Sequence, residues 1–238
     1  MYTRTNRLNK DTRLITFNKD PMPNAYSSVE VKFGRTVVYC TVSLSSDVPE
    51  FASKVNKGWL SAEYSMLPAS TGSRKKRDGI KQDGRGVEIS RLIGRSLRAS
   101  VDLYKMNGYS IIIDCDVIVA DGGTRTAAIS GGFCALKLAV NRMIKEGLIS
   151  ENPILFSLAS ISAGKVSSEI MVDLDYIEDS SAEVDFNIVM NDRSEYIEIQ
   201  GSAEKGIMKR DEFNALLDYS ENALKTIFKF QNDFFASV

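Results

Sequence analysis

The sequence predicts an α/β protein of the α+β type, with a mixed sheet and helices packed on one side. Residues 27–44 alternate apolar and polar side chains around Gly34, which is the pattern of a β-hairpin. Residues 127–144 and 211–235 carry apolar side chains at approximately helical spacing. Strands and helices do not alternate regularly, so a Rossmann-type parallel sheet is not expected.

The remaining elements follow from shorter patterns. Residues 59–67 are expected to form a strand or an extended packed segment, and residues 87–103 a helix with one apolar face. Residues 111–119 are mostly apolar, as in a largely buried strand. Further strands are expected over residues 155–166, 169–174, 186–190 and 196–200. No linker rich in Pro, Gly or Ser divides the chain, so residues 1–238 are predicted to form one domain.

Composition restricts the possible chemistry. The 238 residues are 43% hydrophobic and include five prolines, which indicates a globular protein. There is no histidine, and this excludes Ser-His-Asp and Cys-His catalysis and His-ligated zinc or haem. The three cysteines, Cys40, Cys115 and Cys134, lack metal-ligand spacing and are expected to be buried and reduced. No apolar run is long enough to cross a bilayer and no signal peptide is evident, so a soluble cytoplasmic protein is expected.

Positive charge is concentrated in one part of the chain. The net charge is −1, yet residues 70–98 hold nine lysines and arginines against three acidic residues. Such a patch favours a polyanionic partner. Residues 69–86 are expected to form an exposed, mobile loop. Arg91, Arg95 and Arg98 form a stripe on the following helix, which is either a solvated face or a contact with RNA or another subunit.

The segment 121–126 (Asp-Gly-Gly-Thr-Arg-Thr) lies between a predicted strand and a predicted helix. A glycine pair permits a tight turn there and leaves the first amide N–H groups of the helix free to bind an anion, usually phosphate. Thr124 adds a hydroxyl group, and Arg125 adds a planar cation that can hold two phosphate oxygens. The alternative is an ordinary capped helix with a solvated arginine.

Two acidic residues and one further arginine are candidates for the same site. Asp179 and Asp185 are oxygen ligands suited to Mg²⁺, although each could serve only in a turn, a helix cap or a solvent-facing strand position. Arg85 lies between Gly84 and Gly86, where the backbone can approach a ligand closely. The alternative for Arg85 is a plain loop arginine.

Five segments, in one order along essentially the whole chain, resemble the ribonuclease PH family. They are GWLSAEYSMLP (58–68), RLIGRSLR (91–98), DCDV with ADGGTRT (114–126), EDSSAEVD (178–185) and QG (200–201). The family consists of bacterial phosphorolytic 3′→5′ exoribonucleases that trim tRNA 3′ ends. The resemblance implies the mixed-sheet fold of that family.

The resemblance also implies roles for particular residues. The family's phosphate ligands fall on Arg85 and on Gly123, Thr124 and Arg125, with inorganic phosphate as co-substrate. Its acidic pair, linked to Mg²⁺ or Mn²⁺, falls on Asp179 and Asp185, and its tRNA-binding loop arginines fall on Arg74 and Arg77. The family forms a hexameric ring, a trimer of dimers.

The chain departs from the family at two places. Relatives usually carry an arginine after the Met-Leu-Pro sequence, where this chain has Ala69, and we hypothesise that Lys75 and Lys76 compensate for it. The arginine- and glycine-rich N-terminus of relatives is only loosely matched, by Arg4, Arg7 and Arg13, so the sequence assigns these residues no role.

The expected function is phosphate-dependent 3′→5′ exonucleolytic trimming of tRNA precursors and other RNA 3′ ends, releasing nucleoside diphosphates and reversible by nucleotide addition. Phosphorolysis agrees with the absence of histidine, because phosphate is already an anionic nucleophile and needs no base to activate water. Two alternatives stay open: a non-catalytic RNA-binding subunit of a ring, and a metal-dependent hydrolytic nuclease.

Overall fold

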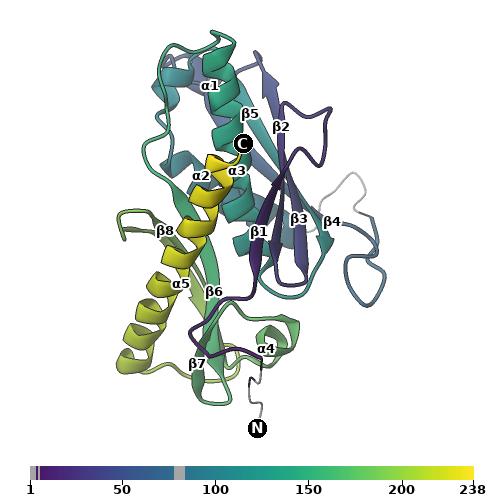
Figure 1. Cartoon of the computed structure of the whole chain (residues 1–238), viewed down its shortest axis with the longest axis vertical. Coiled ribbons are helices and arrows are strands. Elements are labelled where there is room, and N and C mark those ends of the chain that lie inside the picture. The colour runs from purple at the N-terminus through teal and green to yellow at the C-terminus, as the bar shows by residue number, and fades with distance from the viewer. Residues whose placement is uncertain (1–3, 5, 78–83) are drawn as a thin grey trace.

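Two β-sheets with helices against them make up the computed structural model of the chain, which describes residues 4, 6–77 and 84–238 (Figure 1). The strands are β1 (Ile15–Lys19), β2 (Ser27–Phe33), β3 (Thr36–Ser45), β4 (Trp59–Met66), β5 (Ser110–Val119), β6 (Leu158–Val166), β7 (Glu169–Val172), β8 (Val184–Asn191) and β9 (Tyr196–Ser202). The helices are α1 (Glu50–Ser53), α2 (Gly84–Ala99), α3 (Thr124–Lys145), α4 (Tyr176–Ser181) and α5 (Arg210–Ala236), with the 3₁₀ turn η1 (Leu103–Met106).

The first sheet is mixed, in the order β1-β2-β3-β5-β4, and only β4 and β5 run parallel in it. The predicted hairpin is confirmed as β2–β3, with Gly34 at φ +59° in its turn. Val29, Val31 and Phe33 alternate along β2 and are fully buried. Helix α3 packs against β2 and β3, and α2 packs against β4. Helices thus cover one face of this sheet, as predicted.

The second sheet is antiparallel, in the order β7-β6-β8-β9. Every residue of β6 is buried, because both of its faces are covered. Ile161 and Ala163 belong to the main hydrophobic cluster on the side of α3 and α5. On the opposite side, Val166 and Leu174 belong to a smaller cluster beneath α4. The cluster also includes Ala182, the residue that directly follows α4.

Helix α3 lies between the two sheets and packs against β2, β3 and β6. Its glycines permit this close approach: a Cβ on Gly131 would overlap Val31 and lie 2.9 Å from the Cys40 sulfur. The expectation that no apolar run is long enough to cross a bilayer was wrong, because α3 qualifies by length and composition. In the structure, 72% of that stretch is buried inside the protein. The N-terminus of α3 is thereby held at the junction of the sheets.

The long C-terminal helix α5 packs one face against the second sheet and β1 (Figure 1). Its buried residues recur at helical spacing, as predicted. Gln231 donates hydrogen bonds to the carbonyl oxygens of Ser130 and Leu158, at 3.2 and 3.1 Å. This side chain ties α5 to both α3 and β6.

Some predicted boundaries were wrong. Helix α2 begins at Gly84, not at residue 87, and ends at Ala99, not at residue 103. Arg85 therefore lies in the first helical turn and is not a loop residue. Asp179 lies in the short helix α4, while β1, α1 and η1 were not predicted. Residues 78–83 of the expected basic loop lie outside the described residues.

The arginine stripe on α2 makes contacts within the chain. Arg95 forms an ion pair with Glu198 on β9. Arg98 donates to the Leu60 carbonyl oxygen at 2.9 Å and lies over the ring of Trp59. Arg91 and Arg95 are exposed and Arg98 is half-buried, so the stripe is largely solvated but also ties α2 to β4 and β9. The prediction for the cysteines is confirmed, since all three are buried and free.

We propose that residues 1–238 unfold as one domain, because the main hydrophobic cluster includes residues of both sheets. Trp59, the single tryptophan, reports on β4 in the first sheet, whereas far-ultraviolet circular dichroism reports on the whole chain. The two urea unfolding curves are expected to coincide. Separate midpoints would contradict the proposal.

Gly131→Ala is expected to destabilise the protein by about 1–3 kcal/mol, because the added methyl group overlaps Val31 in a close-packed core. Gly132→Ala is a matched control on the same helix, since its Cβ would lie 3.3 Å from a flexible Leu97 methyl group. Urea denaturation measures both free energies of unfolding. Equal values for the two variants would contradict the steric argument.

Candidate active site

The N-terminus of α3 opens into a cavity of about 310 Å³. Segments far apart in the sequence line it: the first turns of α2 and α3, the middle of β6, helix α4, the start of β8 and the loop after β9. The lining residues are Arg85, Gly123, Thr124, Arg125, Ser162, Tyr176, Asp179, Ser180, Ala182, Asp185, Phe186, Asn187 and Glu204. The structure thus brings the predicted phosphate ligands and the predicted acidic pair into one cavity.

Two glycines shape the turn that precedes α3. Gly122 and Gly123 have φ values of +75° and +67°, in the left-handed region where other residues are strained. A Cβ on Gly122 would also lie 2.9 Å from the Asp175 Cα atom. The turn is therefore packed directly against the segment that leads into α4. The first-turn N–H groups of α3 have no intrahelical acceptors, so this end of the helix is suited to an anion.

A buried tyrosine orients the hydroxyl group of Thr124. The Tyr64 hydroxyl lies 2.7 Å from the Thr124 hydroxyl. Burial raises the pKa of Tyr64, although Thr124 and the nearby cations Arg85 and Arg125 act in the opposite direction. Tyr64 was not predicted as a site residue; its place in the family-like segment 58–68 was the available signal.

The acidic side of the cavity carries Asp179 on α4 and Asp185 on β8. Burial raises the pKa of Asp179, and the Asp185 carboxylate raises it further, while Arg125 and Arg85 oppose the shift. Burial also raises the pKa of Asp185, and Glu204 adds to it. Each carboxylate is thus held at a cost when ionised, which a bound cation would relieve.

Glu204 lines the cavity but was not predicted. It follows β9 in a loop that no motif distinguished, so the sequence offered no signal for it. Glu204 is close enough to raise the pKa of both Asp179 and Asp185. The acidic side of the cavity therefore carries one more negative charge than the sequence analysis assigned to it.

The donor set of this acidic side fits a hard divalent cation. Asp179 and Asp185 supply carboxylate oxygens, which Mg²⁺ and Mn²⁺ accept. Among the described residues, no three acidic or cysteine side chains converge closely enough to enclose an ion. An ion held by Asp179 and Asp185 would therefore take its other ligands from water and from phosphate oxygens.

The basic loop adjoins the cavity only in part. A second cavity of about 270 Å³ shares Arg85 with the first and is also lined by Lys75 and Lys76. The Lys75 ammonium group lies 3.2 Å from the Met66 sulfur atom. Arg74 and Arg77 are exposed and lie outside the linings of both cavities. The structure thus brings the two lysines, and not the two arginines, next to the predicted phosphate ligands.

These features define a class of enzyme. A helix N-terminus and two arginines share one cavity with a carboxylate pair, the combination of groups that suits transfer reactions at phosphate. Comparisons with known proteins place the chain within this class. Models of the 3′ exoribonuclease family match residues 11–141 (domain 1) and 157–223 (domain 2). The chain belongs to this ribonuclease PH family.

Individual relatives support this family assignment. Ribonuclease PH of Neisseria gonorrhoeae (strain NCCP11945) is 45% identical over 234 residues, which is 98% of this chain and 97% of the relative. Ribonuclease PH of Crocosphaera subtropica is 46% identical over 205 residues, covering 86% and 85% of the two chains. These relatives confirm the predicted family and the assignment of the chain as a phosphorolytic exoribonuclease.

Solved structures share the fold at lower identity. A chain of the Archaeoglobus fulgidus exosome with RNA bound to the active site has a TM-score of 0.80 at 20% identity, with 94% of this chain and 90% of that chain covered. Rice (Oryza sativa) Rrp46 has a TM-score of 0.77 at 16% identity, with 95% and 97% covered. They confirm the predicted mixed-sheet fold class.

Asp185→Asn is expected to maintain or raise the melting temperature of the ligand-free protein at neutral pH. The raised pKa means that the folded state disfavours the ionised carboxylate, so removing the charge relieves this cost. As the pH is lowered, wild-type Asp185 takes up its proton at a higher pH than an ordinary aspartate does, and the difference between the two proteins shrinks. Thermal unfolding at several pH values measures it.

Asp175→Ala is the control for this comparison. Asp175 caps α4 by accepting a hydrogen bond from the Glu178 N–H at 3.0 Å, so its loss is expected to cost about 1 kcal/mol. A fall in melting temperature for Asp185→Asn comparable to that of Asp175→Ala would contradict the electrostatic argument.

Proposed function

We propose that the cavity binds orthophosphate between Arg85, Arg125 and the turn at Gly123 and Thr124, and that this phosphate attacks the terminal phosphodiester of an RNA. One observation carries the proposal: the cationic and acidic groups line the same cavity. The oxygen of phosphate forms a bond to the terminal phosphorus atom while the bond to the 3′-oxygen of the preceding nucleotide breaks. The products are a nucleoside diphosphate and an RNA shortened by one nucleotide.

The residues have separate tasks in this reaction. Arg85, Arg125 and the first-turn amides hold the attacking phosphate and offset the repulsion between two anions. Coulomb attraction at contact is worth about 1 kcal/mol in water and several in a partly closed site. Thr124, oriented by Tyr64, adds a further donor to phosphate. A Mg²⁺ or Mn²⁺ ion held by Asp179 and Asp185 would supply charge neutralisation at the transferring group.

The RNA and its partners form a further part of the proposal. The substrates are the 3′ ends of tRNA precursors and other RNAs, whose backbone would contact Lys75 and Lys76 beside the cavity, with Arg74 and Arg77 further out. Ala69 offers no charge to RNA. The free, buried cysteines agree with a reducing cytoplasmic location. The ring of six copies implied by the family would have six times the 26.4 kDa mass of one chain, which light scattering measures.

Arg125→Ala is expected to lower phosphate-dependent cleavage by about 10²–10³-fold, the usual cost of removing one donor to a transition-state anion. The assay follows a 3′-tailed tRNA with and without phosphate and identifies the released nucleotide. Nucleoside diphosphate released only with phosphate supports the proposal. Nucleoside monophosphate formed without phosphate indicates hydrolysis and contradicts it, as does wild-type activity of the variant.

Replacing both Lys75 and Lys76 by alanine is expected to weaken tRNA binding and reduce its salt dependence. Each lost contact to a single-stranded phosphate lowers the slope of log affinity against log salt by about 0.7. A Lys225/Lys229 double alanine variant is the control, because both lysines are exposed on α5. An unchanged slope in the Lys75/Lys76 variant would show that these lysines do not compensate for Ala69.

A further inference from the structure

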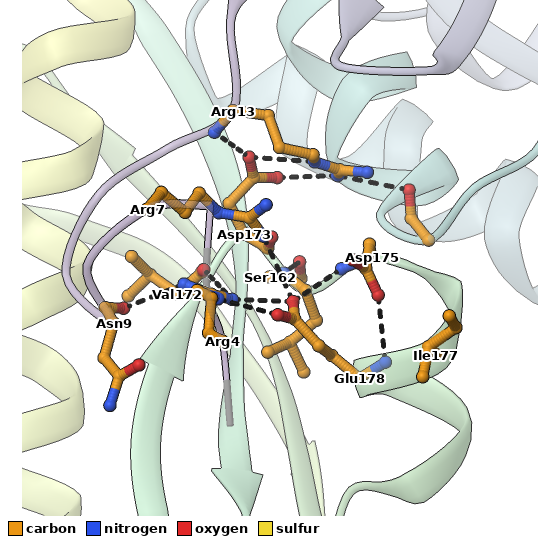
Figure 2. A network of polar contacts seen from close by, with 12 residues as sticks. Arg4, Arg7, Asn9, Arg13, Ser162, Val172, Asp173, Asp175, Ile177 and Glu178 are labelled. Carbon is orange, nitrogen blue, oxygen red and sulfur yellow. Dashed lines mark hydrogen bonds and ion pairs between the residues drawn. The ribbon is translucent and has the colours of Figure 1, made fainter. Parts of the chain in front are cut away.

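Three arginines of the N-terminal segment and two carboxylates form a buried ionic network beside the cavity (Figure 2). The arginines are Arg4, Arg7 and Arg13, and the carboxylates are Asp173 and Glu178. The side chains of Asp173, Glu178 and Arg4 are 0% exposed, and those of Arg7 and Arg13 are 9% and 7% exposed. None of the five lines the cavity described above. They therefore act on it through their neighbours.

The lower part of the network holds α4. Arg4 binds both carboxylate oxygens of Glu178 at 2.6 Å and donates to the Val172 carbonyl oxygen at 3.1 Å. Arg7 donates to the same carboxylate at 3.1 Å. Glu178 also accepts from the backbone N–H of Asp175, completing a capping box at the start of α4. Asp179, the acidic residue of the cavity, is the next residue along this helix.

The upper part of the network holds the turn at Gly122 and Gly123 that precedes α3. Arg13 binds both carboxylate oxygens of Asp173, at 3.0 and 2.7 Å. The same guanidinium donates to the carbonyl oxygens of Asp121 and Gly122, at 2.6 and 3.4 Å. Asp173 also accepts from the Arg13 backbone N–H at 2.7 Å, and its φ is +53°, a conformation uncommon outside glycine. One planar side chain thus joins the turn before α3 to the segment between β7 and α4.

We propose that this network positions the two halves of the active site, with Arg13 setting the phosphate-binding turn and Glu178 setting the helix that carries Asp179. The inference rests on the proposed roles of that turn and of Asp179. The turn belongs to the strand-to-helix connection of the first sheet and α4 to the second, so their relative placement depends on contacts between distant segments.

A role in stability alone accounts less well for this arrangement. Buried ion pairs seldom exceed well-packed apolar residues in stability, because desolvation offsets their attraction. They do fix geometry, particularly when an arginine binds in two directions at once. Arg13 does so between a carboxylate and two backbone carbonyls. The carbonyl oxygens belong to Asp121 and Gly122, immediately before Gly123, and the carboxylate belongs to Asp173. Asp173 lies two positions before Asp175, the N-cap of α4.

The test combines Arg13→Lys, Glu178→Gln and the control Arg142→Lys. Lysine keeps the charge of Arg13 but cannot make the planar double contact. Arg142 lies in the last turn of the same helix α3, is exposed, and donates to the Tyr26 carbonyl oxygen at 2.9 Å. Calorimetry measures the Kd for inorganic phosphate directly. Kinetics on a 3′-tailed tRNA, normalised to the folded fraction, give kcat and the KM for phosphate.

The two ends of the network are expected to behave differently. Arg13→Lys raises the Kd and KM for phosphate about tenfold and changes kcat at saturating phosphate much less. Glu178→Gln lowers kcat about tenfold and leaves the Kd for phosphate within about twofold of wild type. Arg142→Lys matches wild type in every parameter.

Other outcomes overturn the inference. Variants that lose activity only in proportion to their unfolded fraction, with an unchanged Kd for phosphate and unchanged normalised kcat, show a purely structural network. If Arg13→Lys has wild-type Kd, KM and kcat values, the planar contact of Arg13 with Asp173 and the two carbonyl oxygens has no positioning role. A wild-type protein that binds no phosphate at all overturns the proposed phosphate site itself, and the positioning role with it.

Discussion

Close packing around α3 determines where the active site can form. The helix lies between two sheets, and the absence of a side chain at Gly131 lets its backbone approach Val31 and Cys40. A larger residue would push the first sheet away from the helix. Because α3 is held on both sides, its N-terminal amides and the turn at Gly122 and Gly123 have a fixed place at the junction of the sheets. The second sheet contributes Ser162, Asp185 and Asn187 to the cavity there, and the turn and first residues of α3 contribute Gly123, Thr124 and Arg125.

Electrostatic opposition inside the cavity follows from that placement. Burial raises the pKa of Asp179 and of Asp185, while Arg85 and Arg125 lower both in part. The ionised carboxylates are therefore held unfavourably while the cavity is empty, as expected for groups arranged to bind ligands of opposite charge. Outside the cavity, Glu178 shows the reverse: burial alone would raise its pKa, but the hydrogen bond from Arg4 and its other donors lower it overall. The carboxylate of Glu178, which is paired with arginines, thus supports the helix that carries Asp179, whose carboxylate faces the cavity.

The site was predictable where its signal was local. The sequence Gly-Gly-Thr-Arg between a strand and a helix predicted a tight turn, and the structure has that turn with both glycines at positive φ. Arg85 lines the cavity, but its placement in a loop was wrong, because two flanking glycines obscured the start of α2. Arg13 had no local signal, since its partner Asp173 lies 160 residues away. Contacts of that kind leave no spacing pattern in a single sequence.

The sequence by itself determined the elements that depend on neighbours along the chain: the hairpin of the first sheet, the strand β5, the long helices and the turn before α3. It also determined the family, through motifs that retain their order. Only the tertiary structure decided that Lys75 and Lys76 line a second cavity that shares Arg85 with the first, while Arg74 and Arg77 line neither. It also decided that Glu204 joins the acidic side and that Arg4 and Arg13 are buried. Periodicity and turn chemistry are local, whereas burial and charge pairing arise when distant segments pack together.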